Sequence, residues 1–101
     1  MENAFSKKIY SLLCKIPKGK VATYKGLAMA AGKPKAARAV GRILHANKNL
    51  VKIPCHRAVR SDGSIGGYAK GPKKKIALLE KEGLETRQGV VLGFESKLYK
   101  F

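Results

Sequence analysis

The pair Cys55-His56 is the part of this sequence whose side chains are best suited to covalent chemistry. A cysteine attacks a carbon atom only as its thiolate, and a neighbouring imidazole can accept the thiol proton directly or through a water molecule. Adjacent side chains in an extended segment point in opposite directions, so adjacency alone does not establish a working pair. A carboxylate that orients the imidazole would complete the arrangement. Without one, two ordinary core residues are the simpler interpretation.

A zinc site is the other chemistry that these residue types allow. The candidate ligands are the two cysteines and two histidines of the chain: Cys14, Cys55, His45 and His56. Their spacing matches no common structural zinc site, and the sequence has no CxxC pair. We therefore expect no metal.

The charge of the chain indicates a polyanionic partner. Lysine and arginine number 22 against 6 aspartate and glutamate, which gives a formal net charge of +16 in 101 residues. A domain this basic attracts nucleic acid, and the release of counterions from phosphates would drive binding. The alternatives are acidic membranes, ribosomal RNA, or a surface that serves only solubility or heat tolerance.

Length and composition limit the class of protein. A chain of 101 residues, 45% of them hydrophobic, suits one core, and we expect residues 1–101 to form a single domain. Two cysteines are few for a secreted disulfide scaffold. Lysines interrupt the apolar pattern of residues 1–16, which is not the pattern of a signal peptide or a membrane span. We expect a reducing compartment, cytoplasmic or nuclear, and no contact with a membrane.

The first half of the chain is expected to be helical. Apolar residues at helical spacing predict a helix over residues 5–16, in which Cys14 would be a small buried residue. Thr23 is a suitable N-cap for a short helix that ends near residue 31, and a second helix is expected roughly over residues 35–46. Two short helices joined by a tight turn containing glycine indicate a helix-turn-helix, in which the second helix normally meets DNA. Its small residues would let it approach a groove closely, although a buried helix face is an equally good interpretation.

The second half is expected to mix turns, short strands and one helix. Residues 50–53 form a short β-rich run, and residues 61–68 have the composition of a wing-like loop. Pro72 can start a helix that Gly83 ends. Residues 90–92 indicate either a strand or a weakly structured tail. The expected fold class is α+β, mostly helical: a winged helix-turn-helix-like DNA-binding module.

The sequence around the cysteine resembles the active-site signature of the O6-alkylguanine-DNA alkyltransferases, the methylated-DNA–protein-cysteine methyltransferases. That signature is Ile53-Pro54-Cys55-His56-Arg57. The resemblance covers roughly residues 3–93. Four further blocks match with the expected spacing between them: residues 23–28, 34–41, 66–68 and 78–83.

This resemblance implies a protein that docks a helix-turn-helix in the minor groove of duplex DNA and flips the damaged guanine into a pocket. Cys55 would attack the alkyl carbon on O6 by in-line displacement and keep the alkyl group as a thioether. No cofactor is implied, because the acceptor is the protein's own sulfur. The implied partner is double-stranded DNA containing O6-alkylguanine, bound by a monomer.

The resemblance also implies a role for each site residue. His56 would deprotonate Cys55 through a water molecule, and Glu82 would orient His56. Tyr24 would protonate guanine N3, and Asn47 would tie the turn between recognition helix and active site. DNA contacts are implied for Thr23, Lys35, Ala36, Ala37, Gly41 and Arg38, with Arg38 filling the space that the flipped base leaves. A base pocket is implied for Tyr68, Ala69, Ala58 and Lys75, with Lys75 able to approach the leaving guanine.

Some positions depart from the family pattern. An N-terminal domain that often precedes this module in the family is not part of these 101 residues. His45, Ala46 and Lys48 replace residues that are more often Arg, Gly and Pro. Ala58 replaces a larger aliphatic residue, and Ala69 stands where serine is frequent, which leaves the preference among alkyl groups open.

Two functions therefore compete. The first is direct reversal of O6-alkylguanine, and possible action on O4-alkylthymine is left open. The alternative is a lesion-sensing or architectural DNA-binding protein without transfer. The alkyltransferase-like proteins sense lesions in that way but carry another residue, often tryptophan, at the position of Cys55. The presence of Cys55, His56, Glu82 and Asn47 favours a stoichiometric, single-turnover transfer.

Overall fold

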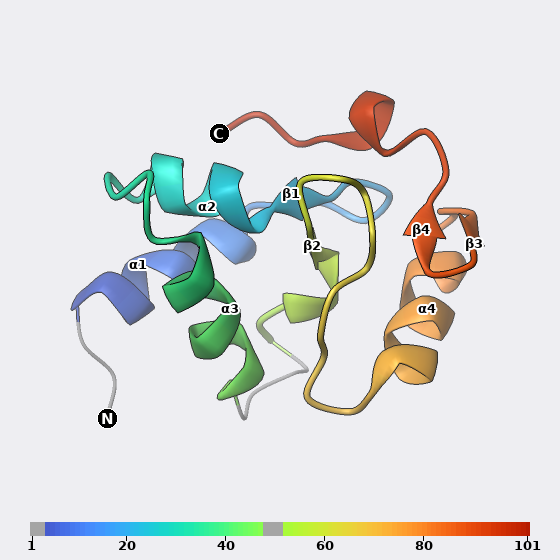
Figure 1. The fold of residues 1–101 in the computed structure, drawn as a ribbon, viewed down its shortest axis with the longest axis horizontal. Helices are drawn as coiled ribbons and strands as arrows, with labels where there is room; N and C mark the ends of the chain where they lie inside the picture. The colour runs from blue at the N-terminus through green and yellow to red at the C-terminus, as the bar shows by residue number, and fades with distance from the viewer. Residues whose placement is uncertain (1–3, 48–51) are drawn as a thin grey trace.

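The computed structural model describes residues 4–47 and 52–101, and its ribbon is shown in Figure 1. The helices α1, α2 and α3 gather on one side, and α4 with the strands β3 and β4 on the other. This is a small, mostly helical α+β fold, as the sequence predicts. Its elements in chain order are α1 (Ala4–Leu13), β1 (Ala22–Thr23), α2 (Tyr24–Ala30), α3 (Ala37–His45), the 3-10 helix η1 (Cys55–Arg57), β2 (Ala58–Val59), α4 (Pro72–Lys81), β3 (Thr86–Arg87), β4 (Val90–Val91) and the 3-10 helix η2 (Phe94–Lys97).

The first helix forms because its apolar residues fall on one face, where Ile9, Leu12 and Leu13 are buried. It ends at Leu13, and Cys14 lies in the following turn with its side chain exposed. The prediction of a buried, helical Cys14 is therefore wrong. Successive helical residues are about 100° apart, so the position after two adjacent buried residues, Leu12 and Leu13, points away from the face that they bury. The Cys14 Sγ donates a hydrogen bond to the backbone oxygen of Lys52 at 3.6 Å.

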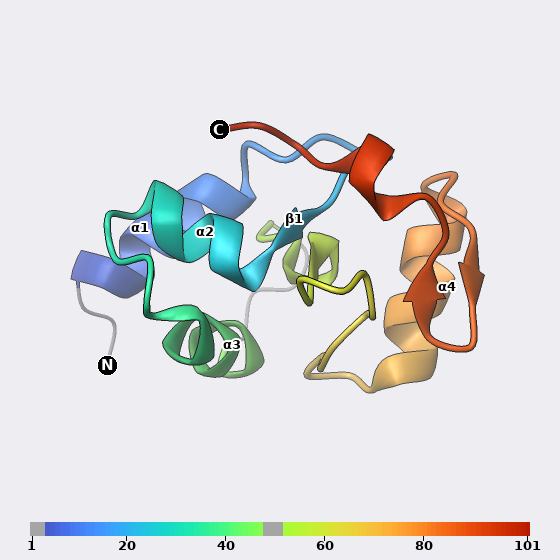
Figure 2. The same cartoon turned by 45° about the horizontal axis from the view of Figure 1, so that its top comes forward.

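The helices α2 and α3 form the predicted helix-turn-helix, and both views show them beside α1 (Figures 1 and 2). Thr23 caps α2, and its Oγ1 accepts a hydrogen bond from the backbone N–H of Gly26 at 2.9 Å. Gly32, with φ +87°, makes the left-handed turn between the helices. In α3, Val40 and Leu44 are buried. This packing fixes which face of α3 points outward.

A short parallel pairing joins the two halves of the chain. Strand β1 pairs with β2 in the register Ala22↔Ala58 and Thr23↔Val59. Because α2 begins directly after β1 and η1 ends directly before β2, this pairing sets the start of α2 beside Cys55. The β-rich run expected over residues 50–53 is not where this strand forms. Residues 50 and 51 lie outside the described residues, and Lys52 and Ile53 lie in a turn and a bend.

The C-terminal elements confirm several expectations. Pro72 begins α4, and Gly83 follows its end with φ +93°. Strands β3 and β4 pair antiparallel, so residues 90–91 form a strand. The glycine-rich segment 61–68 leads from β2 toward α4 and touches this hairpin through a bridge between Ser64 and Val90.

Two clusters of buried side chains lie on opposite faces of the β1–β2 pair. Ala22 and Ala58 belong to the cluster under α1, α2 and α3, whereas Val21 and Val59 belong to the cluster under α4 and the β3–β4 hairpin. Successive residues of a strand point to opposite faces, which explains this division. No helix within residues 4–47 and 52–101 is long and apolar enough to cross a membrane.

Candidate active site

Cys55 begins the 3-10 helix η1, with only 4% of the residue exposed. Asn47 Nδ2 donates a hydrogen bond to Cys55 Sγ at 2.8 Å. Burial raises the pKa of the Cys55 thiol to about 11, although the Asn47 hydrogen bond and the charge of Lys75 act in the opposite direction. At neutral pH the resting group is therefore the thiol. A nearby base is needed before the sulfur can act as a nucleophile.

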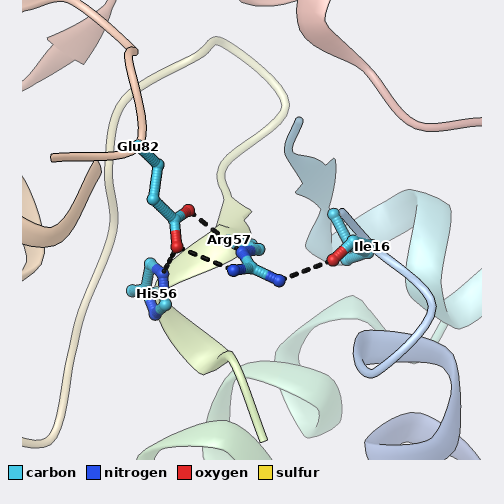
Figure 3. Close-up of polar contacts among 4 residues, drawn as sticks. All are labelled: Ile16, His56, Arg57 and Glu82. Carbon is cyan, nitrogen blue, oxygen red and sulfur yellow. Dashed lines mark hydrogen bonds and ion pairs between the residues drawn. The ribbon is translucent and has the colours of Figure 1, made fainter. Parts of the chain in front are cut away.

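His56 has the protonation state and geometry of such a base. Its Nε2 lies 2.9 Å from Glu82 Oε2, as drawn in Figure 3. Burial lowers the pKa of His56, and the hydrogen bond and charge of Glu82 only partly oppose this. A neutral imidazole that donates through Nε2 keeps a lone pair on Nδ1. That atom is buried and has no hydrogen-bond partner within the described residues, so it can accept a proton.

Glu82 is held in place by Arg57. Arg57 Nε donates to Glu82 Oε1 at 3.0 Å, and Nη2 donates to Oε2 at 2.7 Å. Burial acts to raise the pKa of Glu82, but the hydrogen bonds from Arg57 and His56 outweigh it and hold the pKa below its usual range. The remaining Arg57 nitrogen, Nη1, donates to the backbone oxygen of Ile16 at 2.6 Å (Figure 3). The carboxylate is therefore ionised, and Arg57 connects it to Ile16 in the segment that follows α1.

This contribution of Arg57 was not predicted from the sequence, where the residue stands only as part of the Cys55 signature. The sequence feature that could have predicted it is the arginine directly after the histidine, in a segment that forms a tight turn. Side chains of a 3-10 helix are spaced by three residues per turn, so neighbours are not forced onto opposite sides as in a strand. Both His56 and Arg57 therefore reach the same carboxylate.

A glycine-rich loop covers the other side of the site. Gly66 has φ +70°, and a Cβ added there would lie 2.5 Å from the hydroxyl oxygen of Tyr24. Tyr24 is half-buried, and its burial raises the pKa of its phenol. Tyr68 of the same loop is buried, and its pKa is raised first by burial and then by the charge of Cys55. The loop thus packs against the phenol of Tyr24 and carries that of Tyr68, and both phenols interact electrostatically with Cys55.

Lys75 holds this loop in place from the buried side. The residue is completely buried, and its Nζ donates to the backbone oxygens of Ala58 at 2.6 Å and Gly67 at 3.1 Å. The ammonium also lies 5.8 Å from the centre of the Tyr24 ring. Burial lowers the pKa of Lys75 to about 7. The two hydrogen bonds connect the glycine-rich loop to the strand that follows Cys55.

The structure brings together most of the predicted site residues. Asn47 is hydrogen-bonded to Cys55 and His56 to Glu82, and Tyr24, Tyr68 and Lys75 each interact electrostatically with Cys55. Ala58 is buried and contributes its backbone oxygen, whereas Ala69 is exposed. No group of three or more histidine, cysteine or acidic side chains within the described ranges is placed to hold a metal ion.

The predicted DNA contacts lie on the outer side of the helix-turn-helix. Arg38 and Lys35 are exposed, and three small residues beside them, Ala36, Ala37 and Gly41, are only partly buried. This argues against a face of small residues sealed in the core. The remaining residue, Thr23, has its hydroxyl committed to capping α2.

Comparison with known proteins gives concordant results. The sequence profile of the family described as "6-O-methylguanine DNA methyltransferase, DNA binding domain" matches residues 4–84. A bifunctional methyltransferase/endonuclease of Picrophilus torridus is 45% identical over 92% of this chain, and a methylated-DNA–protein-cysteine methyltransferase of Methanosarcina barkeri is 46% identical over 77%. The chain spans only 30% and 49% of the lengths of these two relatives.

A solved structure is similar over the full length. The crystal structure of S. pombe Atl1 in complex with damaged DNA containing O6-carboxymethylguanine has a TM-score of 0.88 and 32% identity, and the match covers 100% of both chains. The profile match covers far more than half of the sequence, and both the fold and the sequence around Cys55 agree with it. This chain belongs to the family of the 6-O-methylguanine DNA methyltransferase DNA-binding domain.

Proposed function

We propose that the protein repairs O6-alkylguanine in duplex DNA by transferring the alkyl group to Cys55 in a single turnover. The observation that supports this most directly is the pair of residues Cys55 and His56 with the carboxylate of Glu82. A buried cysteine stands beside a neutral histidine whose other nitrogen is bound by an ionised carboxylate. This is the arrangement that nucleophilic catalysis by a thiol requires.

The transfer proceeds in three linked changes. His56 Nδ1 accepts the proton of the Cys55 thiol through a water molecule, and Glu82 stabilises the resulting imidazolium. The thiolate forms a bond to the alkyl carbon while the bond from that carbon to O6 breaks, and its electron pair goes to guanine. The hydroxyl of Tyr24 protonates guanine N3, and the proton held by His56 ultimately replaces it. Overall, the thiol proton takes the place of the alkyl group on guanine.

Access to the base requires that the helix-turn-helix open the duplex. Extruding a base costs a few kcal/mol, which an inserted side chain and pocket contacts can offset. Arg38 is exposed on α3 and suits this role, and the net charge of +16 favours phosphate contacts. That the similar Atl1 structure contains damaged DNA supports DNA as the partner.

Mass spectrometry after incubation with duplex DNA containing O6-methylguanine tests the proposal. We expect one added methylene mass, located on the peptide that contains Cys55. Cys55→Ser should abolish transfer and keep DNA affinity, because serine has a similar size but a far less acidic hydroxyl. Cys14→Ser is the matched control and should transfer normally, since Cys14 is exposed and takes no part in the proton relay of Cys55, His56 and Glu82. Methylation at another residue would refute the assignment of Cys55.

Lesion sensing without transfer is the second candidate. The full-length similarity to Atl1 bound to damaged DNA is the observation that favours it. The same experiment separates the two functions. Selective binding to the lesion with Cys55 left unmodified would establish sensing, whereas a methylated Cys55 would establish repair.

A further inference from the structure

A groove of about 440 Å³ opens beside the relay and has no assigned role. His56, Glu82 and Tyr68 are among the residues that line it. Among the described residues, none from α2 or α3 lines it, so it is distinct from the face of the helix-turn-helix. Its lining residues come from the turn that follows α1, from η1 and the segment before it, from the loop before α4, and from α4 and its C-cap.

Four lysines from four separate segments converge on this groove. Lys18 comes from the turn after α1, Lys52 from the segment before η1, Lys70 from the loop before α4, and Lys74 from the first turn of α4. All four are exposed. Like charges gathered around one opening repel each other, and an anion bound between them would relieve that repulsion.

The groove has little negative charge of its own. Its only acidic lining residue among those described is Glu82, whose two oxygens are already bound by Arg57 and His56. The first turn of α4 contains no acidic residue, although a helix N-terminus favours negative charge. The electrostatic potential inside the groove is therefore positive. An anion from outside the protein would be attracted to it.

The position of the groove connects it to the chemistry of the site. His56 lines the groove, and an anion near an imidazole favours the charged imidazolium that forms when the thiol loses its proton. Tyr68 both lines the groove and is electrostatically coupled to Cys55. An anion in this groove would thus lie beside His56, the residue that directly follows Cys55.

We propose that the groove is an oxyanion subsite, which takes either a phosphate of the bound DNA or the carboxylate of an acidic O6 substituent. Both sources present the same chemistry to the lysines, and both place the anion next to the relay. The inference rests on the proposed function, because both sources belong to the damaged DNA substrate.

The test compares the double variant Lys70→Gln/Lys74→Gln with wild type on three substrates. They are a free O6-alkylguanine base, a duplex with O6-methylguanine, and a duplex with O6-carboxymethylguanine. The matched control is Lys7→Gln/Lys8→Gln, which removes the same charge from exposed positions on α1 outside the groove. Thermal unfolding checks that both variants are folded.

The two sources give different patterns of loss. A carboxylate subsite predicts that the double variant loses about tenfold in transfer rate on the carboxymethyl duplex only, relative to the control variant. A phosphate subsite predicts a similar loss on both duplexes and none on the free base. Rates equal to those of the control on all three substrates would overturn the proposal, as would a loss that includes the free base, because the lysines would then act on the relay itself.

Failure of the proposed function would be seen separately. Wild-type protein that leaves O6-methylguanine duplex unrepaired would refute transfer, whatever the lysine variants do. The same proteins are then compared by their affinity for the two duplexes. A selective loss in the double variant would still support the oxyanion subsite, and equal affinities would overturn it.

Discussion

The carboxylate of Glu82 binds two side chains, His56 and Arg57. Glu82 is therefore the residue whose substitution tests the proposed proton relay most directly. Its oxygens bind both His56 Nε2 and the Arg57 guanidinium. The arginine keeps the carboxylate ionised, and the ionised carboxylate favours protonation of the imidazole. The rate of the proposed proton relay therefore depends on the charge of Glu82. The capacity of the Cys55 sulfur to accept an alkyl group does not depend on that charge.

Glu82→Gln is expected to slow transfer and leave its stoichiometry unchanged. Glutamine keeps the shape but removes the charge, so the rate should fall by roughly ten- to ten-thousandfold, the usual range for a positioned acid–base group. At long times the variant should still reach one methyl group per protein. Single-turnover kinetics with labelled DNA measure both quantities, and Glu85→Gln, at an exposed acid three residues further along the chain, is the control. A normal rate in Glu82→Gln would contradict the relay.

Buried Lys75 should make stability depend on pH. Its pKa is about 7 in the folded protein, below the ordinary lysine value near 10.4 that applies when unfolded. Between these two values the unfolded chain binds a proton that the folded chain does not. The stability of wild type relative to Lys75→Met should therefore rise with pH across this window, by up to ~1.4 kcal/mol per pH unit.

Urea unfolding of wild type and Lys75→Met at pH 6, 7.5 and 9 measures this difference. The contribution should be fully present above pH 10.4 and lost as the pH falls through 7. Lys74→Met, one residue earlier and exposed, is the control. Parallel pH profiles for wild type and Lys75→Met would show that Lys75 keeps an ordinary pKa.

At the scale of elements, two segments are expected to act on the substrate from different sides. The helix α3 presents Arg38 to solvent, and the glycine-rich loop covers Tyr24. The short β1–β2 pairing links them, because it places the start of α2 beside the segment that follows Cys55. Their contributions can be separated by changing one element at a time.

Arg38→Ala should impair repair of duplex DNA far more than reaction with a free O6-alkylguanine base, since the free base needs no flipping. Transfer rates on the two substrates give the comparison. Arg87→Ala in strand β3 removes another exposed arginine, outside the helix-turn-helix, and serves as the control. Equal losses on both substrates would mean that Arg38 supports the fold and not the opening of the duplex.

Gly66→Ala should disturb the loop over Tyr24, and Gly67→Ala should not. A Cβ at Gly66 would lie 2.5 Å from the Tyr24 hydroxyl oxygen, and φ there is +70°, whereas a Cβ at Gly67 meets nothing within 4 Å. The left-handed conformation alone costs about 1–2 kcal/mol for a residue with a side chain. Thermal unfolding and free-base transfer measure the two effects, and similar values for both variants would contradict the close approach.

At the scale of the whole molecule, the excess of 22 basic over 6 acidic residues dominates the behaviour expected toward DNA. Binding should weaken steeply with salt, because phosphate contacts release counterions. We expect at least a ~100-fold loss of affinity between 50 and 200 mM salt, the behaviour of proteins that contact several phosphates. Cys55→Ser allows the titration without reaction. A nearly flat salt dependence would exclude phosphate contacts as the main source of affinity.

Features that depend on neighbours along the chain were determined by the sequence itself. Thr23 caps α2, Pro72 begins α4, and Gly83 follows the end of α4, as predicted. Each signal acts within about one helical turn, through a cap, a fixed φ or a left-handed glycine. The basic charge and the family signature around Cys55 were equally evident, since neither requires knowledge of distant contacts.

Only the tertiary structure decided how distant segments meet. Arg57 binds Glu82 across 25 residues, and Lys75 bonds to Ala58 across 17. The exposure of Cys14 depended on where α1 ends and packs, and β2 formed beside β1 and not over the β-rich run before Cys55. A residue's burial and its partners are set by whichever surface packs against it. The local sequence pattern specifies which face of a helix or strand a residue occupies. It does not specify which distant segment packs against that face.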